Sequence, residues 1–251
     1  MKKSLLSLAV ASSLGLVSAG ALADPIDFQV NEAAYGGAGL VTADLINGGY
    51  VEVITFDGLG GFATKALASF SQFYLNDNPT PVSGSSLGPA GTYNMYAVLD
   101  ETGTVSGNTF TGGAGSMHLY LDPGQNTTLG LGATGNDPVA IGNNGDDIEI
   151  AWSTNIVSGF GVLIPNIGGF FDIWFDDLQL TAAGSSYFVN PNPFYVKANV
   201  DGDFNTFQIQ GTQRIGGDVS VVFAVPEPGT LALLGLAMAG MGLGLRRKNL
   251  A

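Results

Sequence analysis

The chain has 251 residues, a formal net charge of −13 at pH 7 and no cysteine. The missing cysteine excludes disulfides, thiolate catalysis and cysteine-ligated zinc or iron–sulfur centres. The negative charge argues against a nucleic-acid partner, because that affinity rests on Lys and Arg contacts to phosphate. The 38 glycines and 10% aromatic residues indicate a folded chain with many tight turns.

The N-terminal segment has the three parts of a secretory signal. Two lysines precede an apolar run over 5–17, and Ala21 and Ala23 then give the small-x-small pattern that signal peptidase accepts. The run is shorter than the ~20 residues of a membrane-spanning helix. We predict a signal helix over 1–23, cleavage before Asp24, and export across the inner membrane.

The segment that follows is predicted to be one all-β domain over 24–225. Apolar and polar residues alternate between clusters of Gly, Asn, Asp and Pro, which is the pattern of half-buried strands. Strands are predicted over 49–56, 62–75, 93–99, 116–121, 148–152, 169–180, 194–200, 207–210 and 219–225. This number and spacing favour an antiparallel β-sandwich of jelly-roll-like type, although a barrel has similar signals.

A serine motif and the single histidine are the first candidates for chemistry. Residues 84–88 fit G-x-S-x-G, but the nucleophile elbow needs a strand before Ser86 and a helix after it, and Pro and Gly flank both sides. His118 lies in a predicted strand, and zinc sites usually need several His or Cys ligands. We expect Ser86 in a loop, His118 on a polar strand face, and no catalytic residues.

Two acidic segments are candidates for a Ca²⁺ ion, which prefers oxygen ligands. Asp201, Asp203 and Asn205 resemble the first half of a calcium loop, but threonine occupies the EF-hand positions for glycine and glutamate. Asp146 and Asp147 follow two asparagines and a glycine. The alternative is a pair of hairpin turns, where Asp, Asn and Gly suit the backbone geometry. Both interpretations stay open.

Paired carboxylates and aromatic residues raise the question of polysaccharide chemistry. The pairs at 146–147 and 176–177 have the residue type that glycosidases use. Neighbours on a strand point to opposite faces, so neither pair is expected to line one cleft. Trp174 and several tyrosines have rings that stack on sugars, although such residues more often lie in a core. A carbohydrate-binding module and, more weakly, a polysaccharide-modifying enzyme remain alternatives to a structural protein.

The C-terminal segment combines three features of a sorting tail. Pro226, Glu227 and Pro228 precede an apolar run over 231–245 that ends in Arg-Arg-Lys. Extended by two residues, the run reaches about 17 residues, enough for a short transmembrane helix, and the basic end places the domain outside. The segment resembles the PEP-CTERM sorting signal over 226–251. The resemblance implies that an exosortase recognises the Pro-Glu-Pro motif and removes a transient inner-membrane anchor.

Removing both ends leaves a strongly acidic domain. Of the eight Lys and Arg residues, only Lys65, Lys197 and Arg214 lie between the ends. They stand against 20 of the 21 acidic residues, so the mature net charge is about −17. Such a charge keeps an exported protein soluble and favours cations as partners.

A second resemblance covers much of the mature domain. The segments 42–75, 93–107, 115–123 and 211–228 are similar to flocculation-associated PEP-CTERM proteins. This implies a non-enzymatic role in bacterial aggregation, or floc formation, within the exopolysaccharide matrix. We expect signal peptidase and exosortase as processing partners, extracellular polysaccharide as the lasting partner, and an extracellular or outer-surface location.

Overall fold

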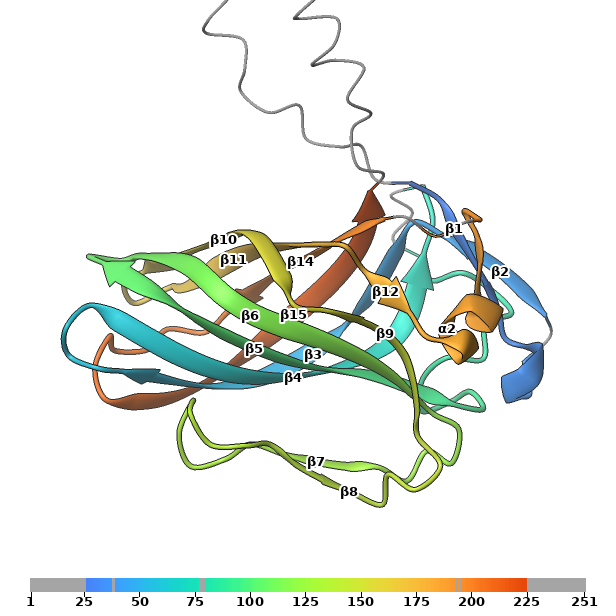
Figure 1. Ribbon diagram of the computed structural model, residues 1–251, viewed down its shortest axis with the longest axis horizontal. Helices are drawn as coiled ribbons and strands as arrows, with labels where there is room; N and C mark the ends of the chain where they lie inside the picture. The colour runs from blue at the N-terminus through green and yellow to red at the C-terminus, as the bar shows by residue number, and fades with distance from the viewer. Residues whose placement is uncertain (1–25, 38, 77–79, 193, 195, 225–251) are drawn as a thin grey trace, which may run out of the picture. The chain divides into compact units, whose positions relative to one another are not determined.

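The computed structural model describes residues 26–224 except 38, 77–79, 193 and 195 (Figure 1). They belong to one compact unit, Pro25–Pro226. The predicted signal helix with its cleavage site, and the predicted transmembrane helix of the sorting tail, fall outside the described residues. Within the described part of the chain, no helix is long and apolar enough to cross a membrane.

Antiparallel strands make up most of the described chain. Two short helices, the 3₁₀ helix η1 (Ala33–Tyr35) and α2 (Ala182–Tyr187), interrupt them. Thr181 caps α2 by accepting a hydrogen bond from the Gly184 amide at 3.0 Å. The strands are β1 Phe28–Asn31, β2 Leu40–Ala43, β3 Leu45–Phe56, β4 Gly61–Tyr74, β5 Asn94–Ser106, β6 Thr109–Asp122, β7 Thr128–Gly130, β8 Ala140–Gly142, β9 Ile148–Ser153, β10 Asn155–Ile164, β11 Gly168–Asp176, β12 Gln179–Leu180, β13 Phe188–Asn190, β14 Lys197–Phe204 and β15 Thr212–Ala224.

The main sheet closes on itself. Its strand order is β10-β11-β14-β15-β3-β4-β5-β6, and β6 pairs again with β10. The first part of β6 pairs with β10, from Thr109↔Val162 to Thr111↔Phe160. Its last part pairs instead with β9, which in turn pairs with β12. The all-β antiparallel prediction is confirmed, with one difference: hydrogen bonds between β6 and β10 join the two layers of the predicted sandwich into a closed, eight-stranded barrel.

Strand alternation explains how the core forms inside this closed sheet. In β3, Ile46, Tyr50 and Ile54 point inwards and are almost completely buried. Each such apolar side chain contributes roughly 1.5–3 kcal/mol by leaving water. The same period in β6 buries Met117 and Leu119. Sequence alternation of period two therefore determines which residues face the interior.

Aromatic side chains fill both ends of the interior. At one end, Phe28 of β1 packs edge-to-face on Phe73, Phe188 and Phe223, with ring centroids 5.1–6.1 Å apart. β1 belongs to a small sheet of order β13-β1-β2, which lies at the same end as α2 (Figure 1). At the other end, the loop between β14 and β15 carries Phe207.

Phe207 contacts three further rings from different strands. They belong to Phe56, Phe110 and Phe204, at centroid distances of 6.2, 6.0 and 5.6 Å. The β14–β15 loop thus closes the interior with an aromatic side chain.

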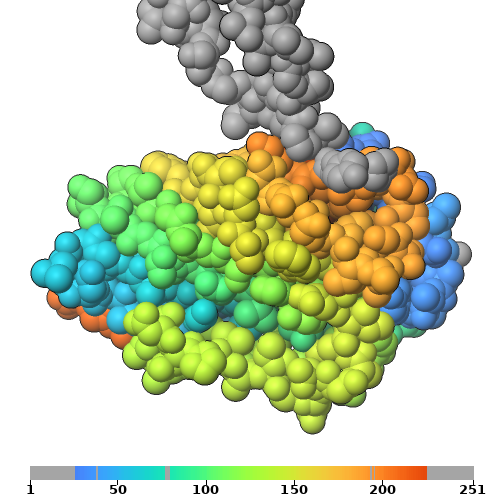
Figure 2. All heavy atoms as spheres, viewed as in Figure 1, coloured from blue at the N-terminus to red at the C-terminus, as the bar shows by residue number. Residues whose placement is uncertain are grey.

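The β7–β8 hairpin forms an arm that lies along the outside of the closed sheet (Figures 1 and 2). The amide of Gly135 donates to Thr55 Oγ1 at 2.9 Å, and Arg214 Nη2 donates to the Gly132 carbonyl at 2.6 Å. These bonds attach the arm to β3 and β15. The connection between β6 and β9 is thereby held against the sheet.

Candidate functional site

Aromatic side chains gather on the outer face of β5, β6 and β9. Because β6 sends every second residue into the core, His118 and Tyr120 face outwards. The Tyr120 ring stacks on Tyr96 at 5.0 Å and on His118 at 6.5 Å. Trp152 lies opposite His118 in the β6–β9 register and is 37% exposed. We call Tyr96, His118, Tyr120 and Trp152 the aromatic strip.

Two carboxylates contact the polar atoms of the strip. His118 Nδ1 lies 2.6 Å from Glu149 Oε1, and the Tyr96 hydroxyl donates to Asp147 Oδ2 at 2.6 Å. Burial raises the pKa of Tyr120, and the negative charge of Glu149 raises it further, so its hydroxyl stays a neutral donor. Tyr96 is only 3% exposed and supports Tyr120 from below, so the accessible rings of the strip are those of His118, Tyr120 and Trp152, with hydrogen-bonding groups beside them. The expectation that His118 lies on a polar strand face is confirmed.

An acidic triad lies beyond one end of this strip. Asp122, at the end of β6, is joined by Asp146 and Asp147 from the segment before β9, and ligand atoms of the three lie within 4.8 Å of one another. Asp122 accepts hydrogen bonds from the amides of Asn126 and Thr127 at 3.3 and 3.1 Å. The turn after β6 thus positions the triad, whose oxygens could serve as ligands for a hard cation.

The sequence identified two members of this triad and missed the third. Asp146 and Asp147 were recognisable from their local Asn/Gly context, whereas Asp122 follows a different strand. Only the pairing of β6 with β9 brings the three together. Among the acidic side chains that the structure describes, this is the single group of three with such close ligand atoms.

The second predicted calcium segment is not a turn. Asp201 and Asp203 lie within β14. Both residues pair with β11, and Asp201 also pairs with β15. Asp203 Oδ1 accepts a hydrogen bond from the Asp218 amide at 3.0 Å, and Asn205 accepts one from the Gly216 amide at 3.4 Å. The turn prediction for 201–205 was wrong because strand pairing on both sides outweighs the local preference of Asp and Gly for turns.

Partial burial and the neighbouring Asp172 raise the pKa of Asp201. The side chains of this segment are spread along a strand rather than gathered in a turn, and those of Asp203 and Asn205 already accept backbone hydrogen bonds.

Ser86 lies in a loop, as expected, and serves a structural purpose. The loop closes around Glu32, whose carboxylate is completely buried. Glu32 accepts hydrogen bonds from the Ser86 amide at 2.9 Å and from the hydroxyls of Ser85 and Tyr93 at 2.8 Å each. The G-x-S-x-G segment therefore satisfies a buried carboxylate and has none of the strand–turn–helix context of a nucleophile.

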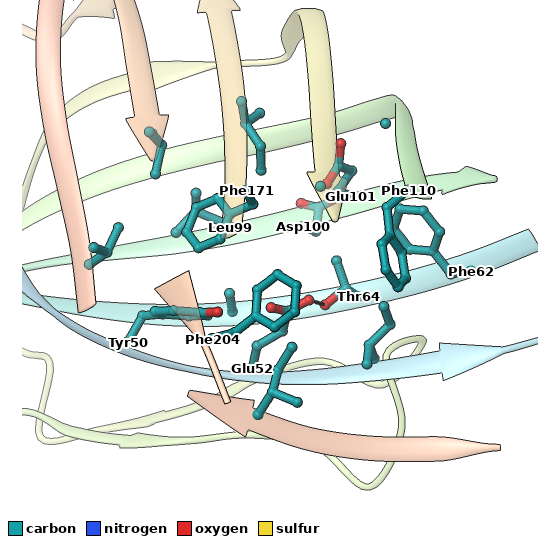
Figure 3. A pocket seen from close by; sticks show the side chains of 18 of the residues that line it. Tyr50, Glu52, Phe62, Thr64, Leu99, Asp100, Glu101, Phe110, Phe171 and Phe204 are labelled. Atoms are coloured by element: carbon teal, nitrogen blue, oxygen red, sulfur yellow. Dashed lines mark hydrogen bonds between the residues drawn. The ribbon is translucent and has the colours of Figure 1, made fainter. Parts of the chain in front are cut away.

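A second candidate site lies inside the closed sheet (Figure 3). It is a cavity of about 80 Å³, lined mainly by apolar side chains from most of the strands. Glu52 of β3 and Glu101 of β5 line it, and the Thr64 hydroxyl donates to Glu52 Oε1. Glu52 shares the inward-facing parity of Tyr50 and Ile54, so the strand pattern alone already places this glutamate inside the sheet.

Burial raises the pKa of both glutamates. Burial raises the pKa of Glu52 to about 7, against the opposing effect of the Thr64 hydrogen bond. Burial also raises the pKa of Glu101 to about 7, and the charge of Glu52 adds to this rise. Gly112 and Gly159 make room for the Glu101 carboxyl, since a Cβ at either position would collide with its Oε1.

Residues 224–248 match the PEP-CTERM protein-sorting motif. The chain therefore carries at its C-terminal end the sorting motif by which exosortases recognise the proteins that they process. The motif implies export, a transient C-terminal membrane anchor and display outside the cell, and it includes Pro226, Glu227 and Pro228. No curated protein and no solved structure matches the chain.

Processing of the tail has a direct test. We expect the extracellular protein to have lost the apolar run over 231–245, because exosortase processing removes the anchor. Intact mass spectrometry of protein recovered from the medium and the cell surface measures this. Protein that still carries residues 231–251 would show a permanent membrane anchor instead.

Calcium binding is predicted to stabilise the domain through the triad. Ca²⁺ should raise the melting temperature more than NaCl of equal ionic strength, because an ion bound only by the folded state stabilises it by mass action. Asp146→Asn should remove this difference. Asp201→Asn is the matched control, since it removes an acidic group from β14. If Asp201→Asn alone abolished the effect, the site would lie at β14.

The buried glutamates predict a characteristic dependence of stability on pH. Their pKa in the folded protein exceeds that of an exposed glutamate, so their stabilising contribution is complete below about pH 4 and is lost as pH rises through about 7. Glu101→Gln should therefore raise the free energy of unfolding at pH 8 by on the order of 1–3 kcal/mol, with little effect at pH 4.

Urea unfolding of wild type, Glu101→Gln and the outer-face variant Glu149→Gln at both pH values measures this difference. A Glu101→Gln protein that is less stable than wild type at pH 8 would contradict the burial of an ionisable carboxyl.

Proposed function

We propose that the mature domain is a non-enzymatic extracellular matrix protein that binds polysaccharide through the aromatic strip and thereby promotes bacterial aggregation. The observation that carries this proposal is the juxtaposition of stacked and exposed rings with Glu149 on one outer sheet face. The sorting motif supports it, because it implies that the domain reaches the outside of the cell.

The strip has the chemistry that a sugar polymer requires. A pyranose ring has a C–H face and hydroxyl groups at its edge, and Tyr and Trp rings combine an apolar face with a polar tip. Tyr120 and Trp152 offer the faces, while Glu149 and His118 offer hydrogen-bonding groups beside them. With a mature net charge of about −17, the best-suited polymer is neutral or carries amino groups, because a polyanion would be repelled.

Aggregation follows from the repetitive nature of such a polymer. One strand of polysaccharide has many identical binding sites, so weak individual contacts combine into a durable attachment by effective concentration. The resemblance to flocculation-associated proteins supports this role. Ca²⁺ at the acidic triad would add a positive charge close to the strip and extend binding to acidic sugars.

An enzymatic role has less support from the geometry. A glycosidase holds two carboxyl groups on either side of a sugar. Asp147 already accepts hydrogen bonds from Tyr96 and Thr127. The other close pair, Glu52 and Glu101, lines a cavity of about 80 Å³, which is smaller than the ~150 Å³ cavity that holds benzene. A sugar ring does not fit there.

The two tryptophans provide a matched test of polysaccharide binding. Trp152→Ala should weaken binding of the mature protein to the polysaccharide of its own cells at least about tenfold, because truncating a tryptophan at the centre of a binding interface typically costs about 2 kcal/mol or more. Trp174→Ala, on the outer side of β11 and outside the strip, should leave the affinity within about twofold. Co-sedimentation with the purified polymer gives the affinity, and circular dichroism confirms the fold.

Settling of a deletion strain complemented with each variant then connects binding to aggregation. Slow settling with Trp152→Ala and normal settling with Trp174→Ala is the expected result. Equal binding and equal settling of both variants would refute the strip as the polysaccharide site. Release of soluble sugars from the polymer by the wild-type protein would identify an enzyme.

A further inference from the structure

We propose that the cavity inside the closed sheet is a binding site for a small organic cation, specifically a primary ammonium group on a short alkyl chain. This site is separate from the aromatic strip, and its function does not depend on polysaccharide binding.

The charge of the cavity lining favours a cation. Among the described residues that line it, the acidic side chains are Glu52, Asp100 and Glu101, and none is Lys, Arg or His. Asp100 has a cationic partner, Lys65, at 3.8 Å. The two glutamates have none, so a positively charged ligand would be the first counter-charge available to them.

Two buried oxygen atoms in this lining have no hydrogen-bond partner. Tyr50 is only 7% exposed, and neither its hydroxyl nor Glu101 Oε1 has a partner among the described residues. The Tyr50 hydroxyl points into the cavity, towards Glu52 (Figure 3). Buried polar groups in folded proteins are normally satisfied. The N–H groups of an ammonium would supply donors where the protein supplies none.

Glu52 is the residue that we expect to bind the ammonium group directly. Thr64 donates to its Oε1, which orients the carboxyl, and the residue lines the cavity. Glu101 adds negative charge from the neighbouring wall, and the two groups interact electrostatically. An ammonium beside Glu52 would be attracted by both carboxylates once they ionise.

The rest of the lining selects an organic cation rather than a metal ion. Ca²⁺ takes six to eight oxygen ligands, but most lining side chains are hydrocarbon. The rings of Phe110, Phe171 and Phe204 suit an alkyl chain and attract a nearby cation through their electron-rich faces (Figure 3). A metal would lack ligands here, whereas an alkylammonium matches both the carboxylates and the rings.

The volume limits the size of the ligand. A cavity of about 80 Å³ is roughly half the volume that holds benzene, so it admits a chain of about three or four heavy atoms. For so small a ligand, a dissociation constant of about 0.1–10 mM is expected. Propylammonium fits this description and has a neutral analogue of the same size, 1-propanol.

Calorimetric titration of the exported protein with propylammonium chloride tests the proposal. The titration is run at about pH 8, where the carboxyls are ionised. We expect saturable binding of propylammonium and at least about tenfold weaker binding of 1-propanol. Glu52→Gln should weaken propylammonium binding at least about tenfold, because it keeps the side-chain shape and removes the charge. Glu149→Gln, on the outer face, should leave it unchanged.

A cavity-filling variant locates the site independently of charge. Ala66 lines the cavity, and Ala66→Leu should abolish binding by occupying the space. Equal affinities for propylammonium and 1-propanol, or no saturable binding of propylammonium by wild type up to about 50 mM, would overturn the proposal. So would unchanged binding in folded Glu52→Gln. The comparison of the two ligands on wild type decides the question even if a variant fails to fold.

Discussion

The pairing of β6 with β10 is the interaction on which the rest of this structure depends. It joins β10 to the first part of β6, from Thr109↔Val162 to Thr111↔Phe160, and so covers part of a sheet edge that would otherwise be open to other chains. Glycine makes this approach compatible with a charged residue inside, because Gly112 and Gly159 leave the space that Glu101 occupies. Closure also turns one face of every strand into a desolvated interior, which is why Glu52 and Glu101 have a raised pKa.

The same strands supply both candidate sites through their alternation. β5 sends Glu101 inwards and Tyr96 outwards, and the second half of β6 sends His118 and Tyr120 outwards while Met117 and Leu119 face the interior. The sites therefore share a scaffold without sharing side chains, so variants of one can leave the other intact. The outer site is a strip of rings open to a long polymer, whereas the inner site is small and lies within the closed sheet. Their chemistry suits two unrelated ligands of a domain that carries a PEP-CTERM sorting motif.

Strand pattern and terminal motifs were the most predictable features. The alternation in 49–56 and 116–121 correctly indicated β3 and β6, and the Pro-Glu-Pro tail was recognisable because its motif is local. The turn at 201–205 was mispredicted because pairing of β14 on both sides is a non-local effect. The contribution of Asp122 to the acidic triad, and the closure that encloses Glu52, depend on contacts between distant segments. No local pattern encodes such contacts, since they follow from register and packing.

Amide hydrogen exchange along β10 tests the closure most directly. A strand paired on one side exposes every second amide to solvent, whereas a strand paired on both sides protects consecutive amides. We expect the amides of Phe160, Gly161 and Val162 all to be protected to a degree similar to those in the centre of β3, because β10 pairs with both β11 and β6. Fast exchange of every second amide in this stretch would show that β10 is a free edge and that the sheet is open.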